Sequence, residues 1–169
     1  MNLDGILSGI RVLDLSQYLA GPHCTLLLSG MGAEVIRLDN PETGDSLSGA
    51  PVFYGEQGPT IEKRDDSDIG IAFLKRQRGK KSITLDLKSP EGHALFLRLI
   101  EKADVLVENF SVGVTERLKI DWPRLQRVNP KLVYCSITGY GATGPDAKRR
   151  AYDLTTQAMS GLMSVTGQP

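Results

Sequence analysis

The sequence has little cysteine and little histidine. Only Cys24 and Cys135 occur among the 169 residues, and they form no Cys-x-x-Cys pair. This spacing argues against a metal site or a redox couple, so we expect two reduced, buried thiols and no bound metal. His23 and His93, the two histidines, show no pattern of a catalytic triad or of a metal site.

Neither charge is in excess, and no long apolar run is present. Twenty Lys and Arg residues balance 20 Asp and Glu residues, whereas a dedicated nucleic-acid binder is usually basic as a whole. No apolar run approaches the roughly 20 residues of a membrane helix, and residues 1–5 lack the basic and apolar regions of a signal peptide. We expect a cytoplasmic protein that binds neither nucleic acid nor membrane.

What the sequence does contain is a regular alternation of strand and helix patterns. Residues 10–15 and 34–39 are predicted strands, separated by a predicted helix over 23–31 whose Leu26, Leu27 and Leu28 face a core. This βαβ unit implies parallel strands. Further strands are expected at 81–87, 104–108 and 132–137, and further helices after Ser89, at 111–118, after Asp121 and near Asp153.

This order predicts an α/β fold with an open, mostly parallel, Rossmann-like sheet and helices on both faces. Ser89, Pro90 and Glu91 supply an N-cap, a first-turn proline and an early acid, which together indicate a helix start. Residues 41–69 lose the pattern and are expected to form one long loop.

Ligands of open α/β sheets bind at the carboxyl ends of the strands, so the loops there are candidates for a site. The loop Ser16–Pro22 contains Gly21, which permits close approach of a ligand. It lacks a complete Gly-x-Gly-x-x-Gly, and Asp39 is more simply a strand-end cap than a ribose-binding acid, which weakens a dinucleotide interpretation.

Three other segments contain candidate ligand-binding residues, but composition alone does not decide between a functional and a structural role for them. A basic run could hold phosphates or form a solvated loop; it consists of Lys75, Arg76, Arg78, Lys80 and Lys81. Asn109, Phe110 and Arg117 suit an adenine ring and phosphates, although Phe110 could equally be a core residue. Asp153 could cap a helix or stand beside an anionic substrate.

Taken together and in this order, the motifs resemble the family III CoA-transferases, the CaiB/BaiF group. The resemblance is carried by residues 9–14, 20–22, 32–37, 78–88, 103–110 and 136–141 and extends over essentially the whole chain. It implies that residues 1–169 are the N-terminal, CoA-binding α/β domain of such an enzyme, an apparent fragment.

The resemblance also implies an activity. Such an enzyme moves CoA from an acyl-CoA thioester to a carboxylic acid acceptor through a covalent aspartyl intermediate. Family members form interlocked homodimers and use no metal; CoA is a substrate and not a permanently bound cofactor. The nucleophilic aspartate of the family would lie beyond Pro169, so we expect no turnover from this segment alone.

Carried over by position, the family's CoA contacts fall on several of the loops described above. The expected contacts are Leu19, Ala20, Leu85, Asp86, Leu87, Lys88, Asn109, Phe110, Arg117, Arg150 and Tyr152. The resemblance also makes Lys80 and Lys81 better candidates for phosphate binding than their charge alone does. Asp153 is assigned an auxiliary catalytic role only.

Three alternatives stay open. A racemase of acyl-CoA α-carbons would place a His-Asp pair where this chain has Tyr152 and Asp153, and tyrosine, with a pKa near 10, is a poor base at neutral pH. The transferase is therefore favoured. A CoA-binding fragment without catalysis is the second alternative, and a pyridine-nucleotide oxidoreductase, disfavoured by the glycine pattern, is the third.

Overall fold

A five-stranded sheet forms the body of the molecule in the computed structural model, which describes residues 5–167. Its strands are β1 (Arg11–Asp14), β2 (Glu34–Asp39), β6 (Lys81–Thr84), β7 (Val105–Glu108) and β8 (Val133–Ser136). The order is β6-β2-β1-β7-β8, and every neighbouring pair is parallel. The predicted open parallel sheet is confirmed, and its strand order reverses between β1 and β7.

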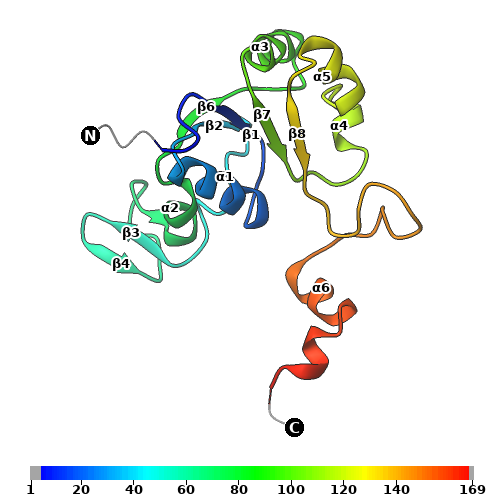
Figure 1. Cartoon of the computed structure of the whole chain (residues 1–169). Coiled ribbons are helices and arrows are strands. Elements are labelled where there is room, and N and C mark those ends of the chain that lie inside the picture. The colour runs from blue at the N-terminus through cyan, green and yellow to red at the C-terminus, as the bar shows by residue number, and fades with distance from the viewer. Residues whose placement is uncertain (1–4, 168–169) are drawn as a thin grey trace.

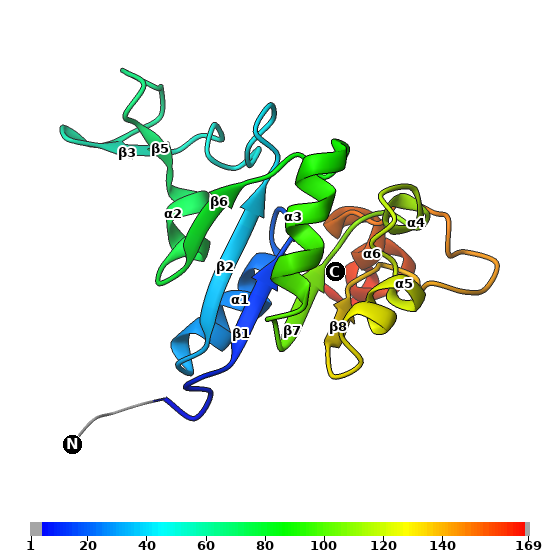
Figure 2. The same ribbon diagram turned by 90° about the horizontal axis from the view of Figure 1, so that it is seen from above.

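Helices cover both faces of this sheet, as predicted. On one face α1 (Ala20–Gly30) contributes Leu28 to a cluster with Val12 of β1. On the other face α3 (Pro90–Ile100) and α5 (Trp122–Val128) bury Phe96 and Leu125 against Leu13. Figure 2 shows α3 lying across the strands with α5 to one side. Because successive side chains of a strand point to opposite faces, β1 supplies both cores.

The first helix differs from its prediction at its start and on its buried face. It begins at Ala20 and not at His23, because Pro22 falls in the first turn, where a missing N–H breaks no helical hydrogen bond. Leu27 is 54% exposed, so the prediction that it faces the core was wrong, and the fully buried side chains of the helix are Pro22 and Thr25.

The start of α3 is confirmed in detail. The hydroxyl of Ser89 accepts a hydrogen bond from the N–H of Gly92 at 3.0 Å, and Pro90 is the first helical residue. This cap fixes where the chain turns from β6 into the helix.

Residues 41–69 were predicted to form one long loop, and this was wrong. They include a small antiparallel sheet of β3 (Phe53–Gly55), β4 (Gly58–Thr60) and β5 (Ile69–Gly70), followed by α2 (Ile71–Gln77). Figure 1 shows this lobe beside the main sheet. Strands of two or three residues are too short to show a period-2 pattern.

The lobe is joined to the main sheet through Arg37 of β2. The Arg37 guanidinium lies 4.6 Å from the ring centroid of Phe73 and 3.5 Å from the carboxylate of Asp45. These contacts come from residues far apart in the sequence.

Polar and apolar residues alternate over 81–87, which predicts a half-buried strand, but all four residues of β6 are exposed. It is one of the two edge strands of the sheet and is hydrogen-bonded to β2. Its alternating pattern therefore does not reflect burial.

The last described part of the chain stands apart from the sheet. After the short α4 (Val114–Arg117) and β8, the chain forms α6 (Asp153–Met159) and the 3-10 helix η1 (Leu162–Val165), and Figure 1 shows both away from the sheet. None of their residues is buried. The helix expected near Asp153 is confirmed. Residues 168 and 169, on which the fragment interpretation partly rested, lie outside the described residues.

Candidate functional site

A cavity of about 190 Å³ lies where the carboxyl ends of β1, β2, β6 and β7 meet. Leucines and one phenylalanine line part of it, and amides, carboxylates and a lysine line the rest. The lining residues are Leu15, Gln17, Leu38, Asp39, Asn40, Thr43, Leu85, Asp86, Leu87, Lys88, Phe110 and Leu118. Small-molecule sites are usually concave and combine apolar side chains with polar groups that orient the ligand.

The structure brings together the predicted segment Leu85–Lys88 and Phe110 at this cavity. The segment is held in a tight turn, because Asp86 accepts a hydrogen bond from the N–H of Lys88 at 2.9 Å. A Cβ at Gly92 would lie 1.9 Å from the carbonyl oxygen of Asp86, so α3 packs directly against the turn. The start of α3 thereby positions the segment.

Asn109 was predicted to contact the ligand, and the structure gives its side chain another partner. Its amide oxygen accepts from the N–H of Gln17, and its amide nitrogen donates to the carbonyl of Gln17, both at 2.8 Å. Gln17 lines the cavity and Asn109 does not. Asn109 therefore fixes the loop after β1 to the loop after β7.

Glu108 fixes the backbone of Phe110 through its side chain. Its buried carboxylate accepts from the N–H of Phe110 at 2.8 Å and from the hydroxyl of Tyr134 at 3.4 Å. Burial, and secondly the charge of Glu108, raises the pKa of the Tyr134 hydroxyl above its ordinary value. Tyr134 therefore stays protonated and donates to Glu108.

Leu19 and Ala20 are exposed at the start of α1 and do not line the cavity. Arg117 is exposed as well, although its neighbour Leu118 lines the cavity. The loop after β1 and the end of α4 thus lie at the carboxyl edge without closing over it.

The structure does not bring Arg150, Tyr152 and Asp153 to the cavity. All three are exposed, and the helix α6 that follows stands away from the sheet. Tyr152 is the N-cap of α6, so the interpretation of Asp153 as its cap was wrong. The carboxylate of Asp153 accepts from the side-chain amide of Gln157 at 2.8 Å.

The basic run does not form one cluster: Lys75 and Arg78 are exposed, whereas Lys80 and Lys81 pair with carboxylates. Lys80 is buried and pairs with Asp14, and Lys81 pairs with Glu34, the first residue of β2. Neither ammonium is directed into the cavity, so the structure does not support them as phosphate ligands.

Several lining residues were missed by the sequence analysis: Gln17, Asn40, Thr43 and Leu118. Asn40 and Thr43 come shortly after the end of β2, so applying the strand-end rule to β2 would have found them. Asp39, interpreted as a strand-end cap, also lines the cavity, and it pairs with Arg37 and accepts from the hydroxyl of Ser82 at 3.1 Å.

The thiols of Cys24 and Cys135 are free, as predicted, but only partly buried, so the prediction that they are buried was wrong. Burial raises the pKa of Cys135. Among residues 5–167, no group of three or more potential metal-ligating side chains occurs. No helix within the described part of the chain is long and apolar enough to cross a membrane.

Comparison with known proteins gives a consistent result. The model of CoA-transferase family III matches residues 7–169. A succinate–glutarate CoA-transferase of Agrobacterium fabrum is 46% identical over 164 residues, covering 96% of this chain and 40% of that protein. An acetyl-CoA:oxalate CoA-transferase of Acetobacter aceti is 40% identical over 165 residues, covering 98% of this chain and 39% of that protein.

A crystal structure of a CaiB/BaiF family protein from Brucella suis superimposes with a TM-score of 0.87 and 39% identity, covering 98% of this chain and 42% of that one. The chain spans about 40% of the length of the curated relatives that it matches. Sequence and fold therefore agree over nearly the whole chain, which belongs to CoA-transferase family III.

Proposed function

We propose that this chain supplies the CoA-binding part of an enzyme that transfers CoA from an acyl-CoA thioester to a carboxylic acid. The observation that carries the proposal is the cavity at the carboxyl edge, to which Leu85–Lys88 and Phe110 both contribute. Phe110 offers an aromatic face for an adenine ring, and Lys88 offers a cation for a phosphate. Leu19, Ala20 and Arg117 lie at the same edge, within reach of a ligand longer than the cavity.

We further propose a covalent mechanism for the whole enzyme, with an aspartate beyond residue 169 as its nucleophile. The carboxylate oxygen attacks the thioester carbonyl, the C–S bond breaks, and CoA leaves as a thiolate, so that the acyl group and the aspartate are joined in a mixed anhydride. The thiolate then attacks the aspartyl carbonyl of the anhydride, which releases the donor acid and forms an aspartyl-CoA thioester. The acceptor carboxylate attacks this thioester and expels the thiolate again; the thiolate then attacks the acceptor's carbonyl in the second anhydride, which forms the new acyl-CoA and regenerates the aspartate.

The substrate class we propose is a dicarboxylic acid. The relatives named above act, by name, on succinate and glutarate and on oxalate, and a further relative from Haloarcula hispanica is a succinyl-CoA:mesaconate CoA-transferase that is 41% identical over 168 residues. The proposed roles of Arg150, Tyr152 and Asp153 in the complete enzyme's site stay predictions. The interlocked homodimer and the cytoplasmic location also stay predictions.

Calorimetric titration of the complete gene product with CoA and with NAD tests the binding proposal. We expect saturable binding of CoA and none of NAD at the same concentration. Binding of NAD alone would instead favour an oxidoreductase.

A charge reversal at the cavity makes the test specific. Lys88→Glu should weaken CoA binding at least tenfold at low salt, because it places a carboxylate beside a ligand phosphate, and should leave binding of pantetheine unchanged. Lys131→Glu, an exposed lysine after α5, is the matched control and should bind CoA normally. Equal affinities in the two variants would remove Lys88 from the site.

Turnover distinguishes the remaining alternatives. Incubation with succinyl-CoA and a panel of dicarboxylates should give new CoA esters from the complete gene product and none from residues 1–169 alone. Incorporation of solvent deuterium at the α-carbon of an acyl-CoA, without transfer, would favour the racemase. Binding without either reaction in the complete product would favour a non-catalytic CoA-binding protein.

A further inference from the structure

An ammonium group is buried beside the loop that follows β1. The side chain of Lys80 is 1% exposed, and that of its partner Asp14 is fully buried. The ammonium donates to the carboxylate of Asp14 at 3.1 Å, to the hydroxyl of Thr25 at 2.7 Å and to the carbonyl of Pro22 at 2.9 Å. Three acceptors thus match the three donors of a lysine.

Stability of the sheet does not explain this arrangement. Burial lowers the pKa of Lys80, an effect that the charge of Asp14 opposes. Taking two charges out of water is costly, and apolar side chains of similar volume often serve a fold equally well or better. A fully bonded buried pair instead fixes one geometry among its partners.

The partners of the ammonium bracket a single loop. Asp14 is the last residue of β1, and its carboxylate also accepts from the N–H of Ser16 at 3.0 Å and from the Ser16 hydroxyl. Pro22 and Thr25 lie at the other end of the loop, in the first turns of α1. One cation therefore fastens both ends of residues 15–20.

The loop is also packed tightly between these ends. A Cβ at Gly21 would lie 2.3 Å from the hydroxyl of Ser16, so only glycine permits the observed approach. Gln17 is held by Asn109 from the opposite side. The loop is therefore held both by the contact of Ser16 with Gly21 and by the hydrogen bonds of the Gln17 backbone to Asn109.

Lys80 itself comes from another part of the chain, which leads to the cavity. It directly precedes β6, and the chain runs from the other end of β6 into Leu85–Lys88. Strand β2 lies between β6 and β1 in the sheet. The buried pair thus spans β2 and links the segment before β6 to the loop after β1.

We propose that Lys80, through Asp14, Thr25 and Pro22, is a positioning residue that holds the loop after β1 and the segment Leu85–Lys88 in register for the ligand. This inference rests on the proposed binding of CoA at the carboxyl edge. Lys80 contacts no ligand in this role; it acts through the two segments that it joins.

The test is a double variant that removes the charges without leaving a buried one unpaired. Asp14→Asn with Lys80→Met keeps an acceptor for Ser16 and fills the volume of the lysine stem, but removes the ammonium that links the two segments. In the complete gene product we expect cooperative unfolding at a temperature close to that of the wild type. We expect about tenfold weaker CoA binding, together with faster hydrogen exchange in peptides covering 15–22 and 80–88 only. Lys131→Met, at an exposed lysine after α5, should change neither exchange nor affinity.

Two results would overturn the inference: unchanged hydrogen exchange in both segments, or unchanged CoA affinity in a folded double variant. If the wild type itself fails to bind CoA, the proposed function fails, whereas the exchange measurement still reports whether Lys80 holds the loop. Should the double variant not fold, Thr25→Val removes one bond to the ammonium at nearly constant volume. It should then raise exchange in residues 15–22 and weaken CoA binding about threefold, and the absence of both effects would contradict the proposal.

Discussion

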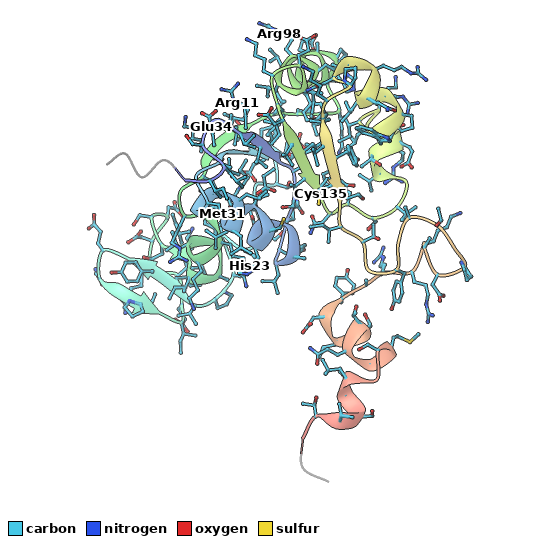
Figure 3. All side chains as sticks on the ribbon, viewed as in Figure 1. Arg11, His23, Met31, Glu34, Arg98 and Cys135 are labelled. Carbon is cyan, nitrogen blue, oxygen red and sulfur yellow. The ribbon has the colours of Figure 1, made fainter. Side chains whose placement is uncertain are left out.

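At the scale of single residues, Glu34 joins three strands on the surface. Its carboxylate accepts from Lys81 of β6 at 2.6 Å and from Arg11 of β1 at 2.7 Å. Figure 3 shows Arg11 and Glu34 next to each other. Hydrogen bonds, first from Lys81 and then from Arg11, lower the pKa of Glu34 from 4.5 to about 2. Since the folded state holds the proton less tightly, the stability that Glu34 contributes is complete above about pH 4.5 and is lost as the pH falls towards about 2.

We therefore expect Glu34→Gln to lower the urea midpoint at neutral pH and to have progressively less effect as the pH falls through about 2. The difference should shrink in high salt, because the pair is on the surface. Glu101→Gln, at an exposed glutamate, is the control. A difference between wild type and Glu34→Gln that did not vary with pH would contradict the assignment.

Asn109 and Asn129 make the same kind of contact in different places. Asn129 donates its amide to the carbonyls of Ile100 and Ala103 at 2.9 and 2.8 Å, whereas Asn109 bonds Gln17 at the cavity. Replacing either by aspartate removes a donor from a carbonyl, and each change should cost about 1–3 kcal/mol of unfolding free energy.

Only Asn109→Asp should also weaken CoA binding, because only Asn109 holds a loop of the site. Urea titration and calorimetry on both variants check this pair of outcomes. Equal CoA affinities would mean that the loop after β1 needs no support from β7.

At the scale of elements, the start of α3 depends on one hydroxyl. Ser89→Ala removes the acceptor for the N–H of Gly92 and should lower the free energy of unfolding by about 1 kcal/mol. Ser89→Asp, which keeps an acceptor, should restore most of it. The urea midpoints of the two variants, each compared with the wild type, measure the loss and its recovery. An equal loss in both variants would mean that the Ser89 hydroxyl does not stabilise the protein as a helix cap.

Elements with local signals could be predicted, and elements held by distant contacts could not. All five strands of the main sheet lie within predicted strands, because short, largely apolar runs mark four of them and an alternation of polar and apolar residues marks β6; Ser89 with Pro90 marks α3. Strands β3 to β5 carry no such signal. Their lobe is attached to the main sheet by contacts of Arg37 with Phe73 and Asp45, which a local sequence pattern does not reveal.

The same distinction applies to the candidate site. Phe110 and Leu85–Lys88 could be expected at the cavity because they follow strand ends. The pairing of Lys80 with Asp14 joins residues 66 positions apart, and a run of basic residues looks the same whether its lysines are buried or solvated.

At the scale of the whole molecule, the chain divides into a packed sheet and an unpacked tail. Residues 152–165 include several strongly exposed apolar side chains, among them Leu154 at 68% and Val165 at 80%. None of the residues in α6 or η1 is buried. The tail therefore contributes little to the cores on either face of the sheet.

Removing residues 153–169 should accordingly leave the sheet's stability unchanged to within about 0.5 kcal/mol, the range of surface changes away from packed features. Phe96→Ala in the core should by comparison cost about 3–5 kcal/mol. The shortened chain should also be more soluble, because exposed apolar side chains promote association. Urea unfolding and light scattering of the two variants beside the full 169 residues provide the measurements. A loss of more than about 2 kcal/mol on truncation, a size typical of buried side chains, would mean that the tail packs against the sheet in solution.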